Sequence, residues 1–368
     1  MISLFLIFFG LGLLIISGSN DMMNRITSKR SNLAGWFGIH HGAYGDLASM
    51  SYLDHVKRFQ ERDEVHYVKP ADDGGTRNID LYIYGDSYLM AVPDSAFSSV
   101  NQYHFGRRTY EELHYSLDPH KKNILIIEYS ERLARNELRR LDIYDHLKKK
   151  EPGSSLQRFS VAPVMYTNMV VLDIFSHEIN RNLEFNLYGY RFWDCIKLAK
   201  VSLTYGFFKR AVGDVVVSDD GSRLFLRQTM APNDISSSYS PVDQKEMQKM
   251  ITNIHAMYDH YKAEGFDEVY LSIIPSPVTI LQPLHYNDLI PELQKTLGLE
   301  NIPVIDVYSL FTRDADPARL FRIGDTHWSN QGVQVWLHKV NAELRKQNRQ
   351  TEKDSANTGH SVPVANNK

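Results

Sequence analysis

The sequence predicts an α/β fold in which helices cover a mostly parallel sheet. Short aliphatic or aromatic runs that end at Gly or Pro recur along the chain, as strands do. Amphipathic segments with apolar residues at three- and four-residue spacing lie between several of these runs. This alternation is typical of a parallel sheet with helices on both faces. With 368 residues and 43% apolar content, the chain is long enough for one large domain or two ordinary ones.

Five segments have the composition of strands. The third contains four consecutive aliphatic residues, as is common in strands that are buried on both faces. We expect the five to form the central sheet. They are IDLYIYG (79–85), the run at 100–105, NILIIEYS (123–130), EVYLSIIPSP (268–277) and IPVIDVY (302–308).

Three segments are predicted helices. Residues 242–265 repeat apolar side chains on one face and end at Gly265, a residue suited to a helix C-terminus. A second helix is expected in the segment NDLIPELQKTLG. The last begins after Ser329, which can serve as its N-cap. Its apolar face consists of Val333, Trp336, Leu337, Val340 and Leu344.

A long segment at about 150–240 interrupts the alternation. It begins with aromatic-rich helical sequence and later places Asp220-Gly221 between two alternating runs, which indicates a hairpin. We interpret it as an insertion that caps or flanks the sheet. The predicted organisation is a signal peptide or membrane anchor (1–20), a linker and peripheral cap (21–77), the α/β domain with its insertion (78–348) and a polar, disordered tail (349–368).

The N-terminus predicts membrane targeting. Residues 2–16 form a long apolar run that is short of the roughly 20 residues of a spanning helix but suits a signal-peptide core or an anchor. Small residues at 17–19 could allow cleavage. Arg25, Lys29 and Arg30 follow, and such residues favour a cytoplasmic location for the side that carries them, which opposes secretion.

Composition excludes several other classes. A net charge of -3 without a clustered basic excess argues against nucleic-acid binding. The single cysteine, Cys195, excludes an intramolecular disulfide. His40, His41 and Asp46 have no second spaced group of ligands, so we expect no metal site and no cofactor.

Two polar motifs follow predicted strands and could form one site. Gly85-Asp86-Ser87 follows the first strand, and Asp325-Thr326-His327 follows the fifth after a connection. In a parallel sheet both would lie at the carboxyl edge, where ligands bind. A serine needs a base, a histidine can be that base, and a carboxylate can orient the histidine. Alone, each motif could be a capped turn or a helix start. Together they predict Ser87, His327 and Asp325 as a catalytic triad.

The motifs IYGDSYL and GDTHWSNQG resemble those of the SGNH/GDSL hydrolase superfamily, in particular its cell-envelope branch that includes the alginate O-acetyltransferases. The resemblance covers about residues 78–345. It implies a three-layer α/β/α, flavodoxin-like domain with the triad above. It also implies an acyltransferase or esterase that acts outside the cytoplasm on O-acyl groups, expected to be O-acetyl, of a polysaccharide. A membrane-bound O-acyltransferase is then the implied partner that delivers the acyl group.

The chain departs from this family at three points. Ser130-Glu131 stand where the superfamily has an Asn, so we expect the Ser87 amide, Gly106 and Arg132 as oxyanion donors. The Asp-x-His spacing differs from the Asp-x-x-His of ordinary GDSL esterases and favours the envelope transferases. The GDS motif precedes the DTHW motif, whereas the alginate enzymes have the reverse order.

Further residues near these motifs are candidate substrate contacts. By the same resemblance, Glu128, Tyr129 and Arg132 lie where the family contacts substrate or oxyanion. Arg132 could instead pair with Glu128, which needs a partner at the end of a buried strand. Tyr88 and Trp328 could stack on sugar rings or simply pack in the core.

Two other functions stay open at this point. The chain could be a non-catalytic glycan-binding or scaffold subunit of a polysaccharide export or modification machine. It could also be a hydrolase of lipids or small esters. Fold alone does not decide between these functions.

Overall fold

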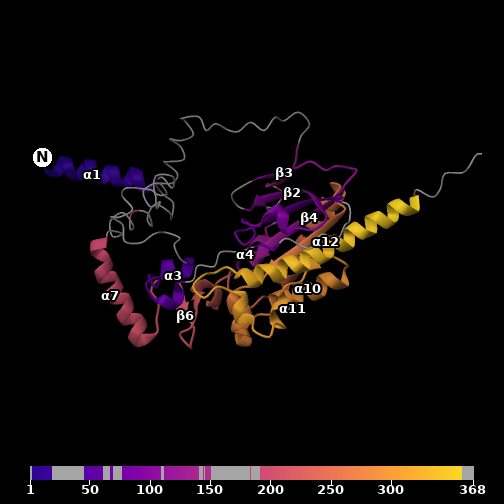
Figure 1. Ribbon diagram of the computed structural model, residues 1–368. Coiled ribbons are helices and arrows are strands. Elements are labelled where there is room, and N and C mark those ends of the chain that lie inside the picture. Colours follow the sequence, from indigo (N-terminus) through magenta and orange to yellow (C-terminus); the bar gives the residue numbers. More distant parts are fainter. Residues whose placement is uncertain are drawn as a thin grey trace, which may run out of the picture. The chain divides into compact units, whose positions relative to one another are not determined.

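The computed structural model describes residues 2–18, 45–60, 67–68, 77–108, 112–140, 144, 146–150, 183 and 191–358 (Figure 1). The chain divides into two compact units. One comprises residues 1–62 and 152–224, and the other residues 63–151 and 225–368. The predicted domain organisation, with its cap and its insertion, stays a prediction.

The second unit is built on a five-stranded parallel sheet in the order β2-β1-β4-β8-β9. Numbered along the chain, this is the order 2-1-3-4-5 of a doubly wound sheet. The order reverses beside β1, because β2 lies on one side of it and β4 on the other. The strands are β1 (Ile79–Gly85), β2 (Val100–Arg107), β4 (Lys122–Ser130), β8 (Glu268–Ile274) and β9 (Val304–Ile305).

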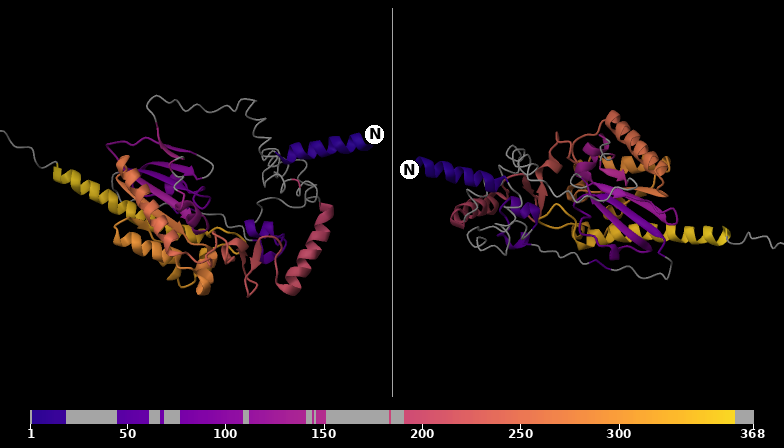
Figure 2. Two further views of the ribbon diagram at one scale, coloured as in Figure 1. Left: turned by 180° about the vertical axis from the view of Figure 1, so that it is seen from behind. Right: turned by 90° about the horizontal axis from the view of Figure 1, so that it is seen from above.

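Alternation along β1 sends successive side chains into two separate cores. Leu81 and Ile83 pack in one core with α12 (Asn330–Thr358), and Tyr82 and Tyr84 pack in the other with α8 (Gln244–Ala263). Figure 2 shows the strands between α12, in yellow, and helices drawn in orange. The α/β class and the helices on both sides are therefore confirmed, and the arrangement is compatible with three α/β/α layers.

Helix α8 begins after an N-cap residue. The carboxylate of Asp243 accepts the Glu246 N–H at 2.7 Å. The remaining helices of this unit are α4 (Glu131–Leu138), α9 (Pro277–Leu281), α10 (Leu289–Leu299) and α11 (Tyr308–Thr312). A small parallel pair, β3 (Leu113–Tyr115) with β5 (Leu147–Lys149), was not predicted, since each strand has only three residues.

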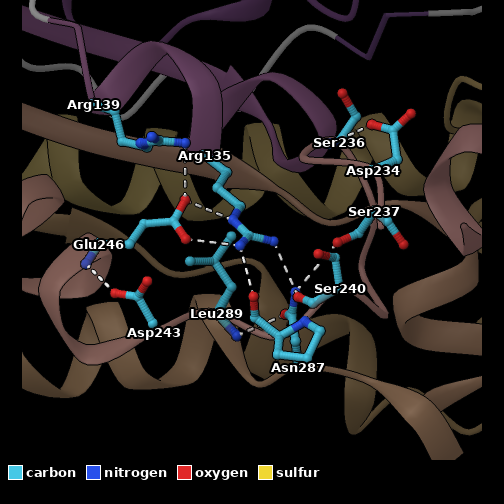
Figure 3. A network of polar contacts seen from close by, with 11 residues as sticks. Arg135, Arg139, Asp234, Ser236, Ser237, Ser240, Asp243, Glu246, Asn287 and Leu289 are labelled. Carbon is cyan, nitrogen blue, oxygen red and sulfur yellow. Dashed lines mark hydrogen bonds and ion pairs between the residues drawn. The ribbon is translucent and has the colours of Figure 1, made fainter. Parts of the chain in front are cut away.

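A buried ion pair fixes α4 against α8 and the segment before it. Arg135 donates to both carboxylate oxygens of Glu246, at 2.8 and 2.7 Å. Its remaining N–H groups reach the carbonyls of Ser240 at 3.0 Å and Pro241 at 2.6 Å (Figure 3). Asn287 donates to the same Ser240 carbonyl at 2.8 Å. The guanidinium thus binds a bidentate carboxylate and two carbonyls. These hydrogen bonds offset the cost of removing the arginine charge from water.

Two sequence predictions at the C-terminal end are corrected. The fifth strand contains only Val304–Ile305 rather than 302–308. The predicted disordered tail is helical up to Thr358, because α12 continues through residues rich in Lys, Arg, Gln and Glu, which favour helices. Residues 359–368 lie outside the described part.

The first unit contains α1 (Ile2–Ser17), α3 (Asp46–Met50), α7 (Arg191–Phe208) and β6 (Val215–Val217). Within it, Phe59 packs edge-on against Tyr205 of α7, with ring centroids 5.6 Å apart. The predicted hairpin is present: β6 pairs with β7 (Leu224–Leu226), and Gly221 adopts a positive φ of 68° in the turn. A glycine suits this turn because it adopts positive φ without steric cost.

The apolar N-terminal run forms α1, and several of its large side chains, such as Phe8 and Phe9, are exposed. At 1.5 Å per residue, its 16 residues extend about 24 Å. Among the described residues, no helix combines the length and the apolar character needed to cross a membrane.

Candidate active site

Ser87 lies in the turn that directly follows β1, at the point where the strand order reverses. Its Oγ is 2.9 Å from Nε2 of His327, although 240 positions separate the two residues in the chain. Nδ1 of the same imidazole is 2.7 Å from Oδ1 of Asp325. The three predicted residues therefore form a continuous chain of hydrogen bonds, as the sequence analysis expected.

The segment that carries Asp325 and His327 is a closed loop between two buried anchors. Phe321 and Trp328 form an antiparallel bridge at its base, and the Ser329 N–H donates to the Leu320 carbonyl at 2.9 Å. The Ser329 hydroxyl accepts the Gly332 N–H at 3.3 Å, which makes Ser329 the predicted N-cap of α12. The loop thus enters a long, packed helix, and this arrangement holds the His327 ring in place.

The ionisation of Asp325 is set by its neighbours. Burial opposes the charge, but the hydrogen bond and charge of His327 and the charge of Arg322 outweigh it and lower the pKa of Asp325 to about 2. Oδ1 of Asp325 also accepts the backbone N–H of His327 at 2.9 Å. The Arg322 guanidinium lies 3.7 Å from Oδ2 of Asp325. An anionic Asp325 fixes the tautomer that leaves Nε2 free to accept a proton from Ser87.

Tyr88 and Trp328 pack around the histidine rather than facing solvent. The Tyr88 ring lies 4.8 Å from the His327 ring and 5.4 Å from the Trp328 ring, and its hydroxyl donates to the Thr326 carbonyl at 2.5 Å. Tyr88 is 7% exposed and Trp328 only 3%. Of the two alternatives left open by the sequence, core packing is therefore the one that the structure supports for both rings, because neither presents a face for a sugar to stack on.

The Asp86 carboxylate binds backbone N–H groups at the turn. Its Oδ1 accepts the Tyr88 N–H at 2.9 Å and its Oδ2 accepts the Ser130 N–H at 3.1 Å. The Asp86 N–H in turn donates to Oε2 of Glu128 at 2.8 Å. No acceptor binds the Ser87 N–H within the described part of the chain. That amide is therefore available to a developing oxyanion, a contact commonly worth about 3 kcal/mol per donor.

The predicted pairing of Glu128 with Arg132 is wrong. No contact joins these two described side chains, and it is Arg108, after β2, that approaches Glu128 by donating to its main-chain carbonyl. Arg108 also donates to Glu137 at 2.7 Å and lies 3.6 Å above the Tyr129 ring. Arg108 was not predicted from the sequence, although a basic residue directly after the second predicted strand was a signal for it.

The other candidate contacts have different outcomes. Tyr129 is 3% exposed and packs in the core beneath Arg108, with its hydroxyl 4.0 Å from Sδ of Met257, so its predicted substrate contact is not supported. Gly106 lies in β2, where a side chain would meet Cβ of Leu113 at 2.5 Å; packing explains this glycine, and its role as an oxyanion donor stays a prediction. The predicted role of Arg132 is likewise untested: its side chain is half-buried at the start of α4.

The expectation that the chain holds no metal is also untested, since His40 and His41 lie outside the described residues.

The arrangement can perform nucleophilic acyl chemistry. Ser87 is partly accessible and 27% of the His327 side chain is exposed, so an ester could reach both atoms. The base is within hydrogen-bond reach of the nucleophile, and a carboxylate orients the base. No family model, curated protein or solved structure matches the chain.

Proposed function

We propose that the chain is a serine acyltransferase or esterase of the SGNH/GDSL hydrolase type, which acts outside the cytoplasm on O-acyl groups of a cell-envelope or exported polysaccharide. The observation that carries the proposal is the hydrogen-bonded series Ser87–His327–Asp325, with separations of 2.9 and 2.7 Å. A serine hydroxyl is a weak nucleophile unless such a base removes its proton.

The proposed reaction has two steps. His327 Nε2 takes the Ser87 proton as Oγ attacks the acyl carbonyl, and the resulting imidazolium returns the proton to the departing alcohol. The Ser87 N–H stabilises the tetrahedral oxyanion. In the second step His327 deprotonates water or a sugar hydroxyl, which attacks the acyl-enzyme and releases Ser87. Water gives an esterase and a sugar hydroxyl gives a transferase.

The location outside the cytoplasm and the membrane attachment are part of the proposal. Support comes from the apolar helix α1, whose large side chains are exposed, and from the resemblance of the GDS and DTHW motifs to envelope enzymes. In the transferase case, a membrane-bound O-acyltransferase is the partner that supplies the acyl group.

Intact mass spectrometry after incubation with 4-nitrophenyl acetate tests the chemistry. The wild-type chain should gain one acetyl group, located on Ser87 by peptide mapping, and should release 4-nitrophenol. S87A should do neither, while S95A, a matched change at an exposed serine, should behave like the wild type. Full activity in S87A would contradict the mechanism. Polysaccharide binding without any acetylation of Ser87 would favour a non-catalytic glycan-binding subunit instead.

A further inference from the structure

A pair of buried carboxyl groups lies directly beneath the Ser87 turn, and the proposed mechanism does not use it. Glu128, near the end of β4, is fully buried, and Asp86 is 7% exposed. The Asp86 N–H donates to Oε2 of Glu128 at 2.8 Å. A buried carboxylate without a nearby unpaired cation is costly, so such a group tends to take up a proton.

The charges around the pair favour a protonated Glu128. The charged groups that act on Glu128 are Asp86 and Arg108, which follows β2. Arg108 is the cation among these groups, and its guanidinium already pairs with the Glu137 carboxylate at 2.7 Å. If Asp86 and Glu128 were both ionised, the cluster would bury two uncompensated negative charges, which is strongly unfavourable.

The two carboxyl groups differ in their hydrogen bonds. The Asp86 carboxylate accepts two backbone N–H groups, from Tyr88 and Ser130. The Glu128 carboxyl accepts one, and its Oε1 is buried without an acceptor or donor in the described part. Burial, together with the charge of Asp86, raises the pKa of Glu128 well above its usual value.

We propose that Glu128 is a positioning residue that remains a neutral carboxylic acid at neutral pH and locks the Asp86–Ser87 turn by accepting the Asp86 N–H. This inference rests on the proposed function only where it concerns catalysis. The Asp86 amide is bound to Glu128, and the backbone N–H groups of Tyr88 and Ser130 bind the Asp86 carboxylate. The next amide in the turn, that of Ser87, is left free to face the substrate.

The end of β1 and the neighbouring strand restrict where the Glu128 carboxyl can lie. A Cβ at Gly85 would stand 2.6 Å from Oε2 of Glu128, so the strand must end in glycine for the carboxyl to reach the turn. Register places Glu128 beside Ser272 of β8, whose hydroxyl accepts the Trp336 indole N–H at 3.0 Å. Neighbouring strands and α12 therefore hold the carboxyl where it is.

Infrared spectroscopy of the full chain tests the protonation state without depending on activity. The wild-type protein at neutral pH should show the C=O stretch of a protonated buried carboxyl, and E128Q should lose it. A difference spectrum is needed because Glu131 is also fully buried, with a raised pKa caused mainly by burial. S87A should keep the Glu128 band, and E292Q, at an exposed position of α10, should leave it unchanged. Absence of a wild-type minus E128Q band would overturn the proposal.

Kinetics separate positioning from a merely structural role. E128Q, which keeps an acceptor for the Asp86 N–H, should retain kcat within about three-fold. E128M, similar in size but without that acceptor, should lower kcat about ten-fold or more with KM nearly unchanged, because only the geometry of the reacting turn is altered. Equal kcat in E128M and the wild type would refute the positioning role. If S87A shows that the chain is not an acyl enzyme, the infrared result still decides the protonation of Glu128.

Discussion

Substitution of Gly85 by alanine should disrupt the site through a single steric contact. The added methyl carbon would stand 2.6 Å from Oε2 of Glu128, 3.3 Å from Cβ of the same residue and 3.3 Å from Cδ1 of Leu89. The first distance is far inside van der Waals contact, so the buried carboxyl must move. The backbone of Gly85 does not have a positive φ, so alanine causes no strain in the main chain itself.

The magnitude follows from two costs and one gain. Overpacking of a filled core costs about 1–3 kcal/mol. Loss of the hydrogen bond from the Asp86 N–H to Glu128 leaves buried polar groups unsatisfied and costs about 1–3 kcal/mol more. Reduced entropy of the unfolded chain returns about 0.4–1 kcal/mol. We therefore expect G85A to lower the free energy of unfolding by about 3 kcal/mol, and to lower kcat because Ser87 follows the displaced turn.

Urea denaturation of the purified chain measures the first effect, and hydrolysis of 4-nitrophenyl acetate measures the second. Gly298 offers a matched control: it lies in α10, and a methyl group added there would meet no neighbouring side chain within 4 Å, so G298A should stabilise the helix by up to about 1 kcal/mol. In the E128A background, the methyl group occupies vacated space, so the cost of G85A should fall by at least about 1 kcal/mol. An unchanged cost in that background would refute the steric argument.

Three further outcomes are expected. D325N should lower kcat by about 10⁴-fold, because an amide does not hold the tautomer of His327 that the reaction needs, and steady-state kinetics would detect any smaller effect. The pKa of Asp325 is lowered to about 2 in the folded state, which contributes about 2 kcal/mol to the free energy of unfolding. This contribution is fully present above the unfolded pKa of about 3.9 and is lost as the pH falls through 2. Acid denaturation of the wild type and D325N measures it, and parallel curves for the two proteins would contradict it. W336F should lower the free energy of unfolding in urea by about 2–4 kcal/mol, because it leaves a cavity and an unsatisfied Ser272 hydroxyl. Adding S272A to W336F should recover about 1 kcal/mol, and no recovery would argue against the hydrogen bond.

Local patterns predicted the elements whose pattern is long and regular. The first strand, Ile79–Gly85, has the predicted bounds. Helix α8 lies within its predicted segment, and α10 extends one residue beyond its own, to Leu299. Prediction failed where the signal was short or where context decides. The three-residue strands β3 and β5 are too short to show a period, and the polar end of α12 is helical because it extends a packed helix.

Candidate side chains were harder to assign than candidate motifs. Tyr129 lies near the end of the third predicted strand, where a substrate contact is expected, yet strand alternation turns its ring toward the core and Arg108. Glu128 lacked its expected partner because Arg132 belongs to the next helix, whereas Arg108 comes from a neighbouring strand. Sequence proximity favours the first pairing, and the parallel sheet produces the second.

The sequence by itself determined the class of fold, the turn after the first strand and the two motifs that hold the serine, the histidine and the aspartate. These follow from local chemistry: aliphatic strands, a glycine stop and a helix N-cap at Ser329. Only the tertiary structure decided that Ser87 and His327 meet at 2.9 Å, since a separation of 240 residues leaves no local signal. It also decided that Glu128 lies beneath the nucleophile and is surrounded by too few positive charges to ionise, because burial and strand order set the electrostatics of that carboxyl.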